Sequence, residues 1–198
     1  MTKPILSAVV VLALLVPPAH AGEWHVDTSH EGNQVQFTSE VVSLRFDGVS
    51  QQIDGFIYWE GDALFAQNGQ FRFEVDMASF DTGIGKRDRD LRAVLNTKKW
   101  PKASFTGTLS PPAPDTSAAH SYVALARGTF SLHGVERPVE VPAHVVLDGA
   151  HAEIDARFAL RLLDYQIEAP SLAAFIKVSE EVDVFVRVRM NDIAQEKE

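Results

Sequence analysis

The sequence contains no cysteine among its 198 residues. It therefore forms no disulfide bond and offers no thiol nucleophile and no thiolate metal ligand. Many small exported domains rely on disulfides, so this chain must be stable through the packing of its core alone. Tryptophan and tyrosine are also scarce, with three residues each, whereas phenylalanine occurs twelve times. Phenylalanine is thus the main aromatic material for a core.

Positive charge is scarce and unevenly spread. Lysine and arginine together number 18 against 27 aspartates and glutamates, and the formal net charge is −9. An acidic chain is a poor general partner for nucleic acid, so we expect no nucleic-acid partner. The exception is residues 86–102, which carry seven basic side chains and only two aspartates. An anionic group or an anionic membrane surface would be attracted to this segment.

Long apolar runs are absent except at the start of the chain. The run at residues 5–16 follows a lysine and is broken by a pair of prolines. It is shorter than the about 20 residues that a membrane-spanning helix needs. An Ala-His-Ala tripeptide ending at Ala21 then presents small residues at the two positions that a signal peptidase reads. We expect residues 1–21 to be a signal peptide, cleaved after Ala21, that exports the protein to the bacterial periplasm; the alternative is an uncleaved membrane anchor.

Alternation of apolar and polar residues dominates the rest of the chain. Its length suits one domain, which we expect over residues 22–190, followed by a charged tail over 191–198. Period-2 patterns of this kind predict strands with one buried face. The clearest predicted strands are 70–76, 138–147, 151–162 and 181–190, and weaker candidates are 24–27, 34–38, 41–46, 53–60, 103–109 and 122–132.

Two segments break the alternation. In residues 88–95, apolar side chains recur at helical spacing, which predicts one short helix with Asp88 as its N-cap and an end before Pro101. Residues 170–175 indicate a helical turn or an irregular crossing. The predicted connections are hairpin turns at His133-Gly134-Val135 and Asp148-Gly149 and a surface loop over 110–119.

The number and length of these strands predict an all-β protein. Eight or more strands joined by short turns indicate a barrel or a sandwich, and the balance of residues favours an antiparallel barrel with one short helix. A barrel of eight strands is just wide enough to hold side chains or one ligand.

Four groups of motifs are weak individually and specific when taken together. They are Phe46-Asp47-Gly48 with Ile53-Asp54-Gly55; Asp76-Met77-Ala78-Ser79-Phe80-Asp81-Thr82-Gly83 with Arg87-Asp88, Leu91, Leu95, Trp100-Pro101 and Phe105; Gly128-Thr129-Phe130-Ser131-Leu132-His133-Gly134-Val135 with Pro138-Val139; and Ile176-Lys177-Val178. With these motifs, residues 23–190 resemble the YceI-like family.

The resemblance implies a lipocalin-like, eight-stranded antiparallel barrel. Members are typically exported bacterial proteins that carry a long apolar molecule, a polyisoprenoid or a lipid-like amide, and they share no catalytic constellation. Two departures lie at the expected barrel mouth. Asp90 stands where the family commonly has a histidine, and the segment between Leu91 and Trp100 is shorter. Both departures bear on the ligand more than on the fold.

Seven phenylalanines are the candidate ligand-binding residues. Inward-facing rings could line a pocket for a hydrocarbon tail, whose burial contributes about 0.8 kcal/mol per methylene. The alternative for each ring is that it fills the core. The candidates are Phe37, Phe56, Phe73, Phe80, Phe105, Phe130 and Phe158.

Four basic residues, Lys86, Arg87, Arg89 and Arg92, are candidates for contact with a ligand head group or a membrane surface. Arginine grips phosphate oxygens in pairs, which favours an isoprenoid phosphate or an anionic lipid as partner. The alternative is a solvated helix face that balances an acidic body.

Motifs for catalysis and metal binding are weak or absent. Asp81-Thr82-Gly83 resembles the aspartic-protease motif, but that chemistry needs two such aspartates and the chain has one copy. We interpret it as a turn in which Asp81 and Thr82 bond nearby backbone and Gly83 permits the bend. The histidines form no close ligand pair and no Gly-x-Ser-x-Gly elbow occurs, so we expect no metal and no cofactor.

These observations together favour a carrier that is not an enzyme and that sequesters a long apolar molecule, an isoprenoid or a lipid, inside the barrel. Its expected partner is that small molecule, with transient contact to a membrane surface. Two alternatives stay open. One is a barrel with a filled core that serves as an envelope stress or membrane-redox partner module, and the other is a hydrolase or isomerase with a carboxylate at the barrel mouth. The ligand's identity and the oligomeric state do not follow from the sequence.

Overall fold

The structure is a computed structural model that describes residues 21–41, 44–116, 119–169, 171–173 and 176–193. The expected signal peptide lies outside the described residues except for Ala21, and so do residues 194–198 of the expected tail. Within the described part of the chain, no helix is long and apolar enough to cross a membrane.

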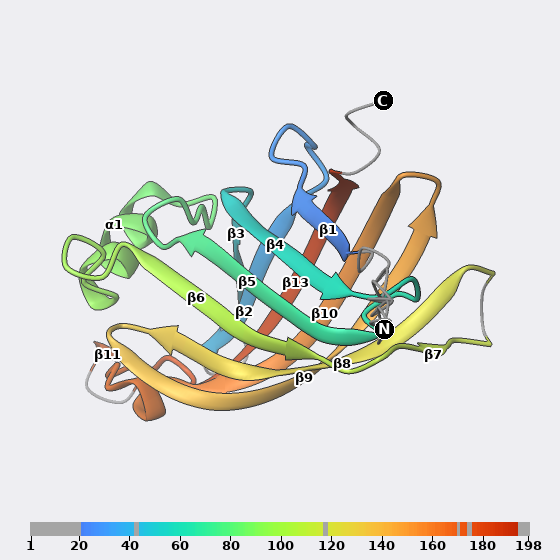
Figure 1. Ribbon diagram of the computed structural model, residues 1–198. Coiled ribbons are helices and arrows are strands. Elements are labelled where there is room, and N and C mark those ends of the chain that lie inside the picture. Colours follow the sequence, from blue (N-terminus) through green and yellow to red (C-terminus); the bar gives the residue numbers. More distant parts are fainter. Residues whose placement is uncertain (1–20, 42–43, 117–118, 170, 174–175, 194–198) are drawn as a thin grey trace, which may run out of the picture.

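Eight antiparallel strands form a closed ring, which confirms the predicted barrel (Figure 1). The ring closes where the last strand pairs with the first, with Trp24 opposite Asp192 and Val26 opposite Met190. In order around the ring, the strands are β1 (Ala21–Val26), β4 (Ile53–Glu60), β5 (Gln67–Asp76), β6 (Lys102–Leu109), β8 (Ser121–Leu132), β9 (Val135–Asp148), β10 (His151–Arg161) and β13 (Glu181–Asp192).

A hairpin of β2 (Gln34–Val41) and β3 (Leu44–Ser50) extends the wall beside the ring. The first half of β13 pairs with β2, whereas its last residues pair with β1, so the hairpin and β1 cover opposite ends of the same strand. The predicted strand over 41–46 is wrong. Val41 ends one strand and Leu44 begins the next, because the two residues are partners across the hairpin.

Two of the three shorter strands, β7 and β11, lie where the sequence predicts irregular structure. Within the predicted loop 110–119, β7 (Ala113–Pro114) pairs with β8. Within 170–175, β11 (Ser171–Ala173) pairs with β12 (Ile176–Lys177), and residues 170, 174 and 175 lie outside the described residues. Of the two alternatives predicted for 170–175, the helical turn is therefore contradicted at Ser171–Ala173, which is extended.

The β8–β9 hairpin turns where the sequence predicts it. His133 and Gly134 both have positive φ, 54° and 76°, as a two-residue turn of this type requires. Gly134 is needed for a second reason, because a Cβ atom there would lie 2.4 Å from Cζ2 of Trp100. The second predicted turn, between β9 and β10, is present with Gly149 at a φ of 61°.

The predicted helix is present but begins earlier than expected. Helix α1 (Gly85–Val94) has Ile84 at its N-cap position, so Asp88 is not the cap. The Asp88 carboxylate instead lies in the first turn and accepts hydrogen bonds from the Thr82 N–H at 2.9 Å and from Thr82 Oγ1 at 2.5 Å. These bonds connect the preceding loop to the first turn of the helix. A 3₁₀ turn, η1 (Leu162–Tyr165), follows β10.

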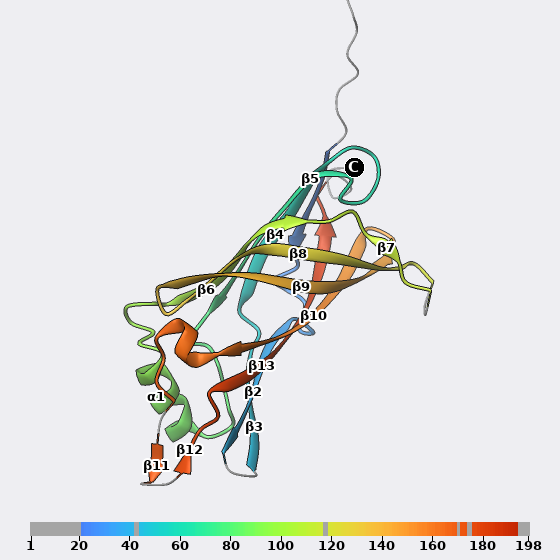
Figure 2. The same cartoon turned by 90° about the horizontal axis from the view of Figure 1, so that it is seen from below.

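The two ends of the barrel are covered differently. Figure 2 shows α1, β11, β12 and the β2–β3 hairpin at one end, and the loop that joins β4 to β5 at the other. At that second end Trp24, Trp59 and Phe65 are buried and pack edge to face, with ring centroids 5.1–5.7 Å apart. We call these three residues the aromatic plug, because they close the barrel at this end.

Candidate functional site

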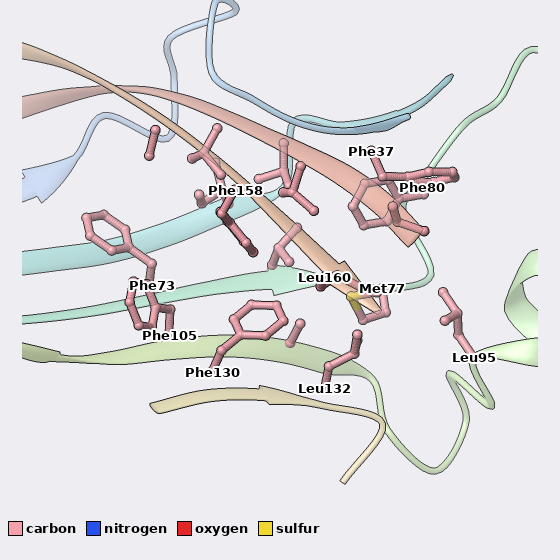
Figure 3. A pocket seen from close by; sticks show the side chains of 18 of the residues that line it. Phe37, Phe73, Met77, Phe80, Leu95, Phe105, Phe130, Leu132, Phe158 and Leu160 are labelled. Carbon is pink, nitrogen blue, oxygen red and sulfur yellow. The ribbon is translucent and has the colours of Figure 1, made fainter. Parts of the chain in front are cut away.

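A cavity of about 780 Å³ occupies the barrel interior, and its lining is mainly apolar (Figure 3). Ligand pockets in proteins are typically about 300–1,000 Å³ and lined by hydrophobic and aromatic side chains. The barrel is therefore hollow on the scale of a ligand, rather than filled by its own side chains.

One wall of the cavity is a ladder of phenylalanines. In the strand register Phe73 lies opposite Phe105 and Phe105 lies opposite Phe130, so the three rings line neighbouring positions of β5, β6 and β8. Phe71 packs edge to face on Phe105 at 4.7 Å between ring centroids, and Phe130 packs likewise on Phe158 at 5.6 Å. Edge-to-face contacts hold the rings against one another and leave their remaining surface turned to the cavity.

Small side chains keep the rest of the interior open. Alanine and valine supply all the cavity positions of β9 and β13 and one position each of β8 and β10, where larger aliphatic residues would fill the space. These positions are Ala126, Val141, Ala143, Val145, Ala156, Val182, Val184, Val186 and Val188.

Six of the seven predicted phenylalanines line the cavity and one does not. Phe56 lies on the outer face of β4, against His25 at 6.1 Å between ring centroids. The strand alternates, with Ile57 lining the cavity, and Phe56 shares its face with exposed Asp54. That shared face was visible in the sequence and identifies Phe56 as an outward residue. The six that line the cavity are Phe37, Phe73, Phe80, Phe105, Phe130 and Phe158.

Three further phenylalanines, Phe46, Phe65 and Phe71, line the cavity although they were not predicted. Phe71 has the same parity as Phe73 in an alternating strand, so the sequence pattern could have identified it. Phe46 lies on the predicted strand that the structure divides into two. Phe65 lies in the loop after β4, where alternation carries no signal.

The end of the cavity beside α1 is open, and we call it the mouth. Leu44, at the start of β3, and Ile84, before α1, both line the cavity while remaining 67% and 53% exposed. Both side chains therefore present apolar surface at the rim of the cavity.

The four basic candidates divide into two pairs. Lys86 and Arg87 line the cavity, whereas Arg89 is exposed and Arg92 donates from Nε to the Ala78 carbonyl at 2.9 Å. Helical periodicity explains the division, because positions 86, 87, 90, 91 and 94 share one face and 89 and 92 do not. The predicted head-group cluster is thus brought together only in part.

Both cavity-facing cations have local partners. Lys86 forms an ion pair with Asp90 at 2.8 Å, one helical turn on. The Arg87 guanidinium lies over the Phe46 ring at 4.6 Å and donates from Nη2 to the Thr82 carbonyl at 2.6 Å. Asp90 also lines the cavity, so the residue by which this chain departs from the family pattern adds a carboxylate to the mouth.

The Asp81-Thr82-Gly83 segment forms a turn, as predicted. Asp81 Oδ1 accepts a hydrogen bond from the Gly83 N–H at 2.7 Å, and Gly83 has a φ of 77°. Thr82 differs from the prediction, because its hydroxyl bonds the Asp88 side chain instead of nearby backbone.

Among the described residues, every carboxyl group with a resolved pKa shift has a lowered pKa. Hydrogen bonds from Thr82 lower the pKa of Asp88, and those from Lys102 and Arg72 lower the pKa of Glu74. A carboxyl group that acts as a general acid needs a raised pKa, which is the opposite direction. Within the described part of the chain, no three histidine, aspartate or glutamate side chains converge as metal ligands would.

Comparison with known proteins matches the sequence resemblance. The model of the YceI-like domain family matches residues 24–190. A UPF0312 protein of Shewanella denitrificans is 29% identical over 153 residues, which are 75% of this chain and 76% of that protein. A UPF0312 protein of Shewanella sp. strain W3-18-1 is 30% identical over the same shares of the two chains.

Two solved structures share the fold. BcnA of Burkholderia cenocepacia superposes with a TM-score of 0.67 at 20% identity, over 83% of this chain and 98% of that one. A polyisoprenoid-binding domain of Saccharophagus degradans, implicated in plant cell wall breakdown, superposes with a TM-score of 0.63 at 18% identity, over 85% and 98%. The chain therefore shares its barrel fold with both proteins.

Proposed function

Because the chain belongs to the YceI-like family, we propose that it is a carrier that sequesters one long apolar molecule, an isoprenoid or a lipid, inside its barrel. The apolar cavity of about 780 Å³ is the observation that supports this function most directly. A polyisoprenoid-binding domain with the same fold supports the class of cargo. For the hydrocarbon tail of the cargo, the barrel interior then replaces the membrane as the apolar environment.

The cavity volume sets the size of the cargo. At about 30 Å³ for a group the size of a water molecule, the space holds roughly 25 non-hydrogen atoms. Burial contributes about 0.8 kcal/mol per methylene, so a tail of this length binds tightly without many polar contacts. A longer isoprenoid would leave part of its chain outside the mouth.

The mouth would collect its cargo at a membrane surface. Leu44 and Ile84 present apolar side chains at the opening, and exposed Arg89 adds positive charge beside them. An apolar rim with neighbouring cations suits a surface of anionic lipids. The signal-peptide pattern of residues 1–21 supports the bacterial periplasm as the location, where the carrier would move cargo between membranes.

The two alternative functions are less well supported. A filled core, as a partner module for stress or redox proteins would have, is at odds with the hollow interior. A hydrolase or isomerase would need a free carboxylate at the mouth, whereas Asp90, which lines the cavity, is held in an ion pair with Lys86 at 2.8 Å.

Native mass spectrometry of the protein purified from its own host, followed by organic extraction, tests carriage. We expect a bound mass in the lipid or isoprenoid range. Ala156 lines the cavity from β10, and A156F is expected to lose that mass because the ring occupies its place. Ala159 on the same strand is exposed and does not line the cavity, so A159F is the matched control. Wild-type protein that carries no such mass, and takes none up from lipid extracts, would contradict the proposal.

A further inference from the structure

Two buried polar atoms beside the mouth have no hydrogen-bond partner in the described structure. They are Oγ of Ser39, a residue only 4% exposed, and Nε of Arg87. Both residues line the cavity. An unpaired buried polar atom is costly and is rare in native proteins, so a pair of them at one site points to a missing partner.

The two atoms flank the same aromatic ring. Ser39 lies directly opposite Phe46 in the β2–β3 register, which places the side chains of the two residues side by side. The Arg87 guanidinium lies over the Phe46 ring from helix α1. Phe37 contacts Phe46 at 6.2 Å and Phe80 at 5.4 Å between centroids, so the polar pair has an apolar surround (Figure 3 shows Phe37 and Phe80).

The charge of Arg87 is only partly balanced, because beside the hydrogen bonds from Thr82 it helps to lower the pKa of Asp88 but lies in no close ion pair with a carboxylate of the described chain. Within the described chain, Arg87 takes part in no ion pair, and its hydrogen-bonded partner is the neutral Thr82 carbonyl. The two neighbouring aspartates of α1 have other partners, since Asp88 bonds Thr82 and Asp90 pairs with Lys86. A guanidinium only donates hydrogen bonds, and its preferred partner is a carboxylate or phosphate oxygen.

We infer that the cargo carries an anionic oxygen head group, a carboxylate or a phosphate, that accepts hydrogen bonds from the Ser39 hydroxyl and Arg87 Nε. This inference rests on the proposed carrier function and defines its cargo more narrowly. The tail then runs from the mouth along the phenylalanine ladder toward the aromatic plug. A neutral alcohol with the same tail would fill the cavity equally well but would leave the charge of Arg87 only partly balanced.

Matched pairs of probes test the head group. Oleate and oleyl alcohol share an 18-carbon tail, and geranylgeranyl phosphate and geranylgeraniol share an isoprenoid tail. We expect wild-type protein to bind each anion about tenfold or more tightly than its alcohol at pH 8, as hydrogen bonds to charged groups predict. The anion-to-alcohol affinity ratio is then compared between the two pairs. A larger ratio for the oleate pair indicates a fatty acid as cargo, and a larger ratio for the geranylgeranyl pair indicates an isoprenoid phosphate.

Three variants locate the preference. R87M is expected to bring the anion-to-alcohol ratio close to one, and S39A to lower it several-fold, while R89M leaves it unchanged because Arg89 does not line the cavity. If R87M fails to fold, R87K replaces it, since lysine keeps the charge but lacks the Nε donor, and we expect a reduced ratio.

The possible results distinguish failure of the head-group site from failure of the proposed carrier function. Equal binding of anion and alcohol by the wild-type protein, or an unchanged ratio in S39A and R87K, would overturn the head-group site and leave apolar carriage intact. Binding of neither member of either pair would instead overturn the carrier function.

Discussion

The two ends of the barrel are built from the same ring of strands, but one end is closed and the other is open. At the closed end, Trp24, Trp59 and Phe65 are buried against one another. At the mouth, Leu44 and Ile84 are exposed and two buried polar atoms lack partners. A barrel of eight strands is narrow enough for large aromatic side chains to fill one end. At the other end, the helix and the hairpin do not fill the opening. The difference indicates a container with one opening.

Truncation of the aromatic plug is expected to have the largest effect on the free energy of unfolding. W59A is expected to cost about 3–5 kcal/mol of unfolding free energy, because it removes a large buried ring that packs on Trp24 and Phe65. Urea denaturation measures this loss. Y58A is the control, since Tyr58 lies on the outer face of the same strand and should cost much less. Equal losses in the two variants would show that the plug does not hold that end together.

Polar substitutions at the rim of the mouth should change membrane contact without changing stability. The double variant L44D/I84D is expected to bind vesicles about tenfold more weakly, because two exposed apolar side chains lose their favourable transfer. Its unfolding free energy should stay within about 0.5 kcal/mol of wild type. Vesicle co-sedimentation measures the binding. V146D alters an exposed apolar residue on β9 that does not line the cavity, and an equal effect there would contradict a role for the mouth.

The junction between α1 and the preceding loop should weaken in acid. Hydrogen bonds from Thr82 lower the pKa of Asp88, so the carboxylate stabilises the fold above the usual aspartate pKa of about 4. That contribution is lost as the pH falls through the lowered pKa, because the native state must then take up a proton. D88N should therefore be less stable than wild type at pH 7, and the difference should shrink as the pH falls below the usual aspartate pKa of about 4. Urea unfolding across this pH range tests this, and a difference independent of pH would contradict it.

The smallest expected effect concerns the charge beside the mouth. R89Q removes one exposed cation and should weaken binding to anionic vesicles about fivefold at low salt, from about 1 kcal/mol per basic residue near such a surface. Vesicles of neutral lipid are the control and should show no change. Loss of binding to both kinds of vesicle would indicate a structural effect of the substitution instead of an electrostatic one.

The wall of the barrel could be predicted largely from local pattern. Strand β4 occupies the predicted residues 53–60, and alternation placed Phe73, Phe105 and Phe130 on the inner face before their register was known. The prediction for Phe56 is wrong because Phe56 shares the outer face of β4 with exposed Asp54. Asp88 was misplaced for a different reason, since its partner Thr82 precedes the helix and no helical spacing predicts that bond.

The sequence indicated only half of the polar site at the mouth, because Arg87 is one of the basic head-group candidates and Ser39 has no signal of its own. Ser39 is one serine in an alternating strand, and its lack of a partner depends on the β2–β3 register and on where α1 places Arg87. Those positions come from segments almost fifty residues apart in the chain, whose contact no local pattern specifies.

The sequence by itself determined that this protein is a cysteine-free chain of alternating strands with one short basic helix, because side-chain direction along a strand is a property of the local backbone. Only the tertiary structure decided that the interior is hollow and open at one end. A cavity is the difference between the space that a ring of eight strands encloses and the volume of all side chains that point into it. That difference exists only once β1 and β13 have paired and closed the ring.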